Sequence, residues 1–574
     1  MLQNFHIPSS EPVPKQRQAG ILTPVFALRR ERDLGIGDTQ GLMDFMVWMR
    51  GYGFRLIQIL PINATGPDRS PYNAISSRAL DPLTITLEPG RPVDLLPDTF
   101  ERITGQFPVE TLRQRSNVDY PQVTALKHQL LLAAFAQWKK NPSADRLKAF
   151  DDFRQHHGEW LEEFALFEAC ATENHGSIQW DQWEKTPRQA TQVKAWLLGQ
   201  DRSTLERFQE RIQFTEYVQW LAFQQWAEVK AMASHLGVSL LGDIPFGVNY
   251  YGADVFGAPQ MFDLEWSGGA PPEPAFQDSL FVQRWGQNWG IPLYNWDAMA
   301  TDGFQWWKKR LSTLLETAHG CRIDHVLGFY RLYCFPWRPE RDHEFAALSH
   351  EEVRSITHGR VPGFFPHDDW SVENAEANLR IGDLRLRALV EDHGSALIVG
   401  EDLGTVPDYM RPHLQSLGIW TMKIPFWERQ PGHRLVPGSA YEETTLATYA
   451  THDHPPLKEW WEQRQQQAGH HNAHAQWERE ILMEFAKGEE WRDLSWGHAL
   501  HERLVQGLLA SRSRLAVLML SDVFGRADRF NTPGSVSESN WSTRMHASIE
   551  SLVRDVETSQ KLQRLQEAIV LSGR

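Results

Sequence analysis

The chain has 574 residues, of which 41% are hydrophobic and 23% charged, an ordinary composition for a soluble globular protein. Its 58 basic and 73 acidic residues give a net charge of −15, which disfavours nucleic acid or an anionic membrane as a partner. The three cysteines form no CxxC pair, so neither a disulfide framework nor a zinc site is expected. No secretory signal and no apolar run of about 20 residues is visible, and we expect a cytoplasmic protein without a membrane span.

Eight short apolar runs, separated by helical patterns, predict strands. They lie at 20–28, 55–62, 239–248, 320–327, 395–403, 419–426, 446–453 and 515–523. Near-continuous apolar runs are typical of strands buried on both faces of a parallel sheet, and the helices between them indicate βα units. Eight such units predict an α/β fold, a (β/α)8 TIM barrel. A doubly wound open sheet is the alternative, but the stretch 35–38 is interpreted as a turn that caps the next helix, not as a phosphate loop.

The predicted strands are unevenly spaced, which indicates large, mostly helical insertions over the C-terminal face of the barrel. We predict the start of the catalytic barrel in 1–63, an inserted helical subdomain in 64–236, barrel again in 237–330, a smaller insertion in 331–394, and the rest of the barrel in 395–574 with a helical insertion at about 456–510. Histidines 470, 471 and 474 are interpreted as part of a solvated loop.

Acidic residues follow several of the predicted strands directly. Asp324, Glu401 and Asp453 each end an apolar run, and Asp243 and Asp522 occupy similar positions. The active site of a TIM barrel lies at the carboxyl ends of its strands, so these acids predict one polar site. Such a cluster suits either a divalent metal or the cleavage of glycosidic bonds, which needs one carboxylate as nucleophile and one carboxylic acid as proton donor.

The neighbours of two of these acids favour glycosidic chemistry. Arg322 lies two positions before Asp324 and therefore on the same face of the strand. We expect this guanidinium to lower the pKa of Asp324 and keep it ionised, whereas beside a metal it would be unfavourable. Glu401 follows the apolar run 397–400, so partial desolvation is expected to raise its pKa and keep it protonated. No metal and no organic cofactor is expected.

Three motifs, RIDH at 322–325, GEDLG at 400–404 and THD at 451–453, resemble the acid motifs of the 4-α-glucanotransferases called amylomaltase or disproportionating enzyme. These enzymes form glycoside hydrolase family 77 of the α-amylase clan. Further similar segments lie at 33–38, 60–83, 242–255 and 531–541, so the resemblance extends in order over about 20–545.

The resemblance implies a role for each acid. Asp324 would be the nucleophile that forms a β-glucosyl–enzyme intermediate, Glu401 the general acid and base, and Asp453 the group that stabilises the transition state. An α-1,4 bond would be broken and remade between maltooligosaccharides or longer α-1,4-glucans. The predicted substrate-binding residues are Tyr72, Asp243, Arg322, His452, Ser70, Trp289 and Asn295.

The segment 268–290 resembles the mobile loop that family members fold over the donor strand, and Trp285, Trp289 and Trp296 are expected to offer stacking surfaces for sugars. The pair at 454–455 departs from the family pattern. Two alternatives stay open: a hydrolase of the same clan with water as acceptor, and a glucan-binding protein without catalysis. The intact acids argue against the second.

Overall fold

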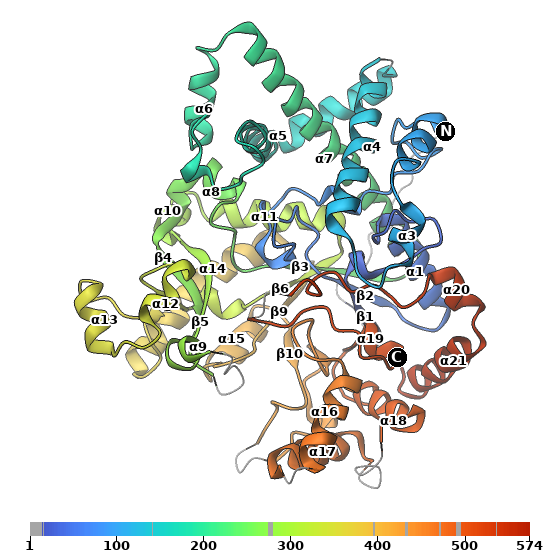
Figure 1. The fold of residues 1–574 in the computed structure, drawn as a ribbon. Helices are drawn as coiled ribbons and strands as arrows, with labels where there is room; N and C mark the ends of the chain where they lie inside the picture. The colour runs from blue at the N-terminus through green and yellow to red at the C-terminus, as the bar shows by residue number, and fades with distance from the viewer. Residues whose placement is uncertain are drawn as a thin grey trace.

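Eight parallel strands form the central sheet of the computed structural model, which describes residues 14, 16–140, 142–273, 279–393, 396–430, 434–469, 472–488, 495–534 and 537–574 (Figure 1). The strands are β1 Gln18–Thr23, β2 Leu56–Ile59, β3 Ser239–Ile244, β6 Gly320–Ile323, β9 Leu397–Gly400, β10 Thr421–Lys423, β11 Thr445–Thr448 and β12 Leu515–Met519. Their order in the sheet is β10-β11-β12-β1-β2-β3-β6-β9. Each predicted run overlaps one of these strands, and nearly every strand residue is buried.

The two edge strands meet, so the sheet closes into a barrel. Val399 of β9 forms a parallel bridge with Trp420, the residue before β10. The Trp420 N–H donates to the Ile398 carbonyl at 2.9 Å, and the Gly400 N–H donates to the Trp420 carbonyl at 2.8 Å. The prediction of a (β/α)8 barrel is therefore confirmed, and the carboxyl ends of all eight strands face one mouth.

The first barrel helix begins as the sequence predicts. The Asp38 side chain accepts the Gly41 N–H and caps helix α1, Thr39–Gly51. Gly37 precedes this cap, and a Cβ there would lie 1.9 Å from the Val25 carbonyl oxygen. Only glycine fits at that position, which explains the glycine-rich turn without any phosphate site.

A group of helices, of which α4, α5 and α7 are long, follows β2 and lies on one side of the barrel (Figure 1). They are α2 Pro97–Thr104, α3 Val109–Gln114, α4 Tyr120–Lys140, α5 Ala144–Glu173, α6 Ala190–Leu197 and α7 Arg202–Leu236. Helix α7 packs against α5 and α1, so it joins these helices to the barrel wall. It ends at Gly237, whose φ of 63° is the left-handed C-cap conformation.

A second sheet stands beside the barrel, and two of its strands extend into the segment 268–290 that was predicted as a mobile loop. It is antiparallel, in the order β5-β4-β7-β8, with β4 Phe262–Ala270, β5 Gln287–Tyr294, β7 Leu332–Phe335 and β8 Gly363–Phe365. The segment 268–290 thus contains the end of β4, helix α9 (Leu280–Trp285) and the start of β5, while 274–278 lie outside the described residues. A Cβ at Gly269 would lie 1.9 Å from the Gln287 carbonyl, so glycine is required where these strands approach.

The remaining helices complete the barrel wall and its margins. They are α8 Ala253–Gly257, α10 Trp296–Ala300, α11 Gln305–Thr317, α12 Asp342–Phe345, α13 His350–Ile356, α14 Val372–His393, α15 Met410–Ser416, α16 Leu457–Gly469, α17 Ala473–Ala486, α18 His498–Leu509, α19 Leu520–Val523, α20 Ile549–Arg554 and α21 Val556–Leu571. Helix α14 packs against α11, and α21 packs against α18 and α20. Within the described ranges, every helix is too short or too polar to cross a membrane.

Candidate active site

A buried arginine gathers three acids at the barrel mouth. Arg322 is 2% exposed, and its Nη1 lies 2.9 and 2.7 Å from the two carboxylate oxygens of Asp243. Its Nη2 lies 2.9 Å from Asp324 Oδ1 and 3.3 Å from Glu401 Oε1. The predicted contact between Arg322 and Asp324 is therefore present, and the same guanidinium also binds the other two carboxylates.

Main-chain bonds between neighbouring strands hold the acids at one level. The Asp324 N–H donates to the Ile244 carbonyl at 2.9 Å, and the Glu401 N–H donates to the Ile323 carbonyl at 2.9 Å. Directly after Asp324 the chain turns through His325, whose φ of 43° is left-handed. This turn points the His325 N–H at Glu401 Oε2, 2.7 Å away. Parallel pairing thus brings acids distant in sequence together.

The expected pKa values of the two central acids are wrong in direction. Burial, assisted by the negative charge of Glu401 and opposed by Arg322, raises the pKa of Asp324 to about 7. Burial also acts on Glu401, but Arg322 and the His325 N–H outweigh it and hold the pKa of Glu401 below its usual value. The physical reason is that Arg322 divides its charge among three carboxylates. Below about pH 7 the two carboxyl groups therefore share one proton between them.

A second chain of contacts runs from Asp243 to Asp453. The Tyr72 hydroxyl donates to Asp243 Oδ2 at 2.7 Å, and its oxygen lies 3.1 Å from His452 Nδ1. The rings of Tyr72 and His452 stack with centroids 4.3 Å apart. His452 Nε2 lies 3.3 Å from Asp453 Oδ2. Burial lowers the pKa of His452, but the negative charge of Asp453 outweighs this effect and holds the pKa above its usual value.

Asp453 is held by two residues near the end of the chain. Asn531 Nδ2 donates to Asp453 Oδ1 at 2.6 Å, and Arg529 Nη2 donates to the Asp453 carbonyl at 3.0 Å. Burial opposes ionisation of this carboxyl, yet His452 and Asn531 keep its pKa well below the usual range. Asn531 was not among the predicted site residues, and its only signal was its place in a segment of family resemblance.

Two predicted substrate-binding residues serve as helix caps in the structure. Ser70 Oγ accepts the Tyr72 N–H at 3.3 Å and so fixes the turn that carries Tyr72. Asn295 Oδ1 accepts the Ala298 N–H at 3.1 Å, and its Nδ2 donates to the Gln260 carbonyl. Substrate contacts from Ser70 and Asn295 stay predictions, since these bonds tie both side chains to the main chain.

Asp522 belongs to the barrel wall and not to the cluster around Arg322. Its Oδ1 accepts the N–H of Leu457, the first residue of α16, at 2.7 Å. Burial raises the pKa of Asp522 to about 7. The position at a strand end therefore serves a structural purpose here. Of the histidines predicted in a solvated loop, those at 470 and 471 lie outside the described residues, and His474 is exposed but belongs to helix α17 and not to a loop.

One of the three expected stacking tryptophans stands beside the acids. Trp289 on β5 is 38% exposed, and its ring meets the ring of His325 edge-on at 4.9 Å. Trp285 is buried and donates to the Phe345 carbonyl, so its prediction as a sugar platform is wrong. Trp296 packs within the aromatic core beside α11. The rings of Trp285 and Trp296 therefore pack inside the protein.

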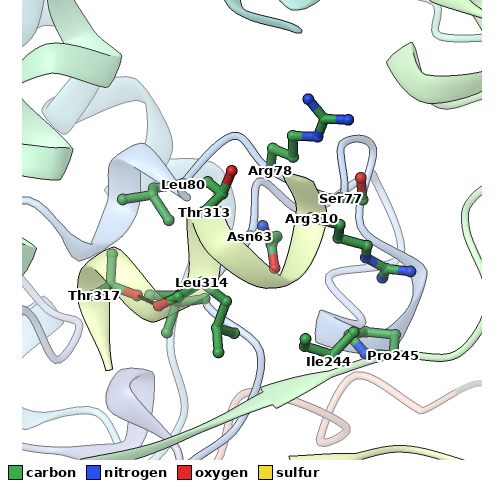
Figure 2. Close-up of a pocket in the computed structure, with 11 residues that line it drawn as sticks. Asn63, Ser77, Arg78, Leu80, Ile244, Pro245, Arg310, Thr313, Leu314 and Thr317 are labelled. Atoms are coloured by element: carbon green, nitrogen blue, oxygen red, sulfur yellow. Dashed lines mark hydrogen bonds between the residues drawn. The ribbon is translucent and has the colours of Figure 1, made fainter. Parts of the chain in front are cut away.

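A separate cavity of about 10 Å³ lies between the end of β3 and helix α11 (Figure 2). Its walls include Asn63, Arg78 and Thr313, and none of the three acids lines it. The volume suffices for about one water molecule. Burial lowers the pKa of Arg78, whose Nε has no hydrogen-bond partner in the described part of the chain. This space is too small for a sugar.

Comparison with known proteins agrees with the geometry. The profile of the 4-alpha-glucanotransferase family matches residues 23–550. The 4-alpha-glucanotransferase of Chlamydia pneumoniae is 30% identical over 545 residues, which are 93% of this chain and 92% of that protein. The enzyme of the same name from Thermus thermophilus is 28% identical over 515 residues, covering 88% and 89% of the two chains.

Two solved structures share the fold. Amylomaltase from Corynebacterium glutamicum superposes with a TM-score of 0.76 at 24% identity, covering 96% of this chain and 75% of that one. Amylomaltase from Streptococcus agalactiae in complex with acarbose superposes with a TM-score of 0.72 at 22% identity, covering 97% and 100%. The extent of the sequence match leaves one conclusion: this chain belongs to the 4-alpha-glucanotransferases, glycoside hydrolase family 77.

Proposed function

We propose that the protein is a 4-alpha-glucanotransferase that moves segments of α-1,4-glucan between maltooligosaccharides by a retaining double displacement. The observation that carries the proposal is the cluster in which Arg322 binds Asp243, Asp324 and Glu401 at the mouth of the barrel. Family membership over residues 23–550 supports the reaction class.

In the first displacement, Asp324 attacks the anomeric carbon of the donor glucose while the bond to the leaving oxygen breaks. Glu401 gives that oxygen a proton, so the shortened glucan departs as a neutral alcohol. The proton that the two carboxyl groups share must therefore be on Glu401, with Asp324 ionised, when attack begins. Arg322, which lies 2.9 Å from Asp324, favours the ionised nucleophile that this transfer produces.

Asp453 and the groups behind it act on the donor sugar. An anionic Asp453 lies opposite a ring that gains positive charge in the transition state. His452 and Asn531 occupy the two carboxylate oxygens from the protein side and so fix the direction of the group. In the second displacement Glu401 removes the proton of an acceptor hydroxyl, whose oxygen displaces Asp324 and restores the α configuration.

Incubation with maltotriose tests the reaction class. A transferase produces glucose together with a ladder of longer oligomers, whereas a hydrolase of the same clan produces only shorter sugars. A second test assigns the roles: Glu401→Gln is supplied with α-maltosyl fluoride, whose leaving group needs no proton. We expect a covalent maltosyl adduct on the peptide that contains Asp324, found by mass spectrometry.

The control for that experiment is Glu391→Gln, an exposed acid on α14, which should turn the donor over without accumulating the adduct. An adduct on any other residue would overturn the assignment of the nucleophile. Unchanged activity in Asp324→Asn would overturn it as well.

A further inference from the structure

His454 directly follows Asp453 and has a fixed ring orientation. The chain turns tightly here, since the His454 N–H donates to the Thr451 carbonyl at 3.1 Å. The same turn brings His454 Nδ1 to 3.2 Å from the Thr451 backbone nitrogen and 2.9 Å from the Thr451 hydroxyl. Both contacts involve one ring nitrogen, so they hold the imidazole in one position.

These contacts also determine which nitrogen carries hydrogen. A backbone N–H can only donate, so Nδ1 of His454 must be the acceptor. Burial lowers the pKa of His454, which keeps the ring neutral. The single ring hydrogen is therefore on Nε2. No described residue accepts a hydrogen bond from that nitrogen, so His454 presents an unused donor.

An exposed tryptophan stands beside this donor. Trp427, which follows β10, is 48% exposed, and its ring centre lies 5.1 Å from that of His454 at an angle of 59°. A flat apolar face next to a hydrogen-bond donor suits a sugar, whose ring faces are apolar and whose edges carry hydroxyls.

The order of the strands places this pair in a defined sector of the mouth. Around the barrel, β9 precedes β10 and β11, so the Trp427 segment lies between Glu401 and Asp453. The negative charges of Asp453 and Glu401 both act to raise the pKa of His454, against the larger effect of burial. Tyr72 and Asp243 belong to the opposite sector, after β2 and β3, where the donor glucose meets the nucleophile. The sector beside the proton donor is the one that the leaving and incoming sugars must occupy.

We propose that Trp427 and His454 form the binding subsite for the glucose unit that leaves as the donor is cleaved and enters as the acceptor. Trp427 stacks on the sugar face, and the His454 Nε2–H donates to a sugar hydroxyl oxygen. His454 is thus a specificity-determining residue for the acceptor. This inference rests on the proposed transferase function.

The test separates the two displacements with α-maltosyl fluoride as donor and glucose as acceptor. The burst of fluoride that the enzyme releases in its first turnover, without glucose, reports the first displacement, in which no sugar occupies this subsite. We expect His454→Leu and Trp427→Ala to release fluoride within about twofold of the unmodified enzyme and to raise the KM for glucose about tenfold or more. His454→Gln keeps an N–H donor and should recover part of that loss. Trp370→Ala and His343→Leu, at exposed sites elsewhere, are the controls.

Each result decides the matter. If the unmodified enzyme shows no acceptor-dependent transfer, the proposed function fails and this inference with it. If transfer occurs but the KM for glucose is unchanged in Trp427→Ala and also in His454→Leu, the proposed function stands and the proposed subsite is wrong. An equal fall in fluoride release and in transfer would mean that His454 merely positions Asp453, and would also overturn the subsite. Circular dichroism shows which variants are folded, and Trp427→Ala carries the test if a His454 variant is not.

Discussion

Replacing Arg322 by lysine keeps a positive charge but removes the guanidinium group, whose two terminal nitrogens contact different carboxylates. One guanidinium nitrogen binds Asp243, and the other binds Asp324 and Glu401. A single ammonium group cannot take both places. We therefore expect Arg322→Lys to keep its contact with the fully buried Asp243 and to lose its hydrogen bond to Asp324 and its ion pair with Glu401.

The size of the effect follows from the bonds that are lost. A hydrogen bond to a charged group contributes about 1.5–3 kcal/mol. If that amount is lost from the transition state, the rate falls roughly 10- to 150-fold. The assay is the initial rate of glucose release from maltotriose. The matched control is Arg385→Lys, a buried arginine that donates to the Phe329 carbonyl and contacts none of the three acids through a hydrogen bond that the structure describes.

Arg322→Met extends the same test to stability. It leaves Asp243 buried without its cation, and breaking a buried ion pair in this way costs about 3–5 kcal/mol. Urea unfolding should show this loss. The reasoning is refuted if Arg322→Lys retains more than about a third of the activity, or if Arg322→Met loses less than about 1 kcal/mol of unfolding free energy.

Three further outcomes are expected. Asn531→Ala removes the 2.6 Å hydrogen bond to Asp453 and should lower kcat about tenfold or more while the urea midpoint stays nearly constant; an unchanged kcat would contradict this positioning role. Asp522, with a folded pKa of about 7 above its unfolded value, binds more protons in the folded state between about pH 4 and 7, so stability falls as pH rises through that window. Asp522→Asn should remove a slope of up to about 1.4 kcal/mol per pH unit in urea unfolding, and an unaltered slope would contradict it. Gly37→Ala places a Cβ 1.9 Å from a carbonyl oxygen and should cost about 1–3 kcal/mol or more, whereas Gly51→Ala meets nothing within 4 Å and should not destabilise, as thermal unfolding can show.

The barrel was predictable because its strands carry an unambiguous signal. Runs such as 515–519 are apolar on both faces, as strands covered on both sides of a parallel sheet require. The second sheet gives no such signal, because β4 contains Ser267, Gly268 and Gly269, and β5 contains Gly290 and Pro292. In this sheet, a glycine such as Gly269 lets the backbones of β4 and β5 approach each other closely.

The sequence was enough to predict which acids lie near one another, but not the direction in which their pKa values shift. Strand ends and family motifs identified Asp324, Glu401 and Asp453, since the parallel sheet brings such positions together. The pKa order failed because it depends on how Arg322 divides its contacts and on the His325 N–H, both of which are three-dimensional facts. Local caps such as Asn295 likewise look like ligands until their partners are seen.

The closing seam of the barrel supports Glu401, the proposed proton donor, less firmly than it supports Asp324, the proposed nucleophile. Asp324 follows β6, which is paired along its length with β3 on one side and β9 on the other. Glu401 follows β9, whose other neighbour, β10, is reached in the described residues through one bridge, from Val399 to Trp420. Because few ladder bonds close this seam, its amides should exchange with deuterium sooner than those of β6. Thermal breathing of the barrel would then move the acid while the nucleophile stays in place, so transfer activity should decline on heating before the global unfolding transition.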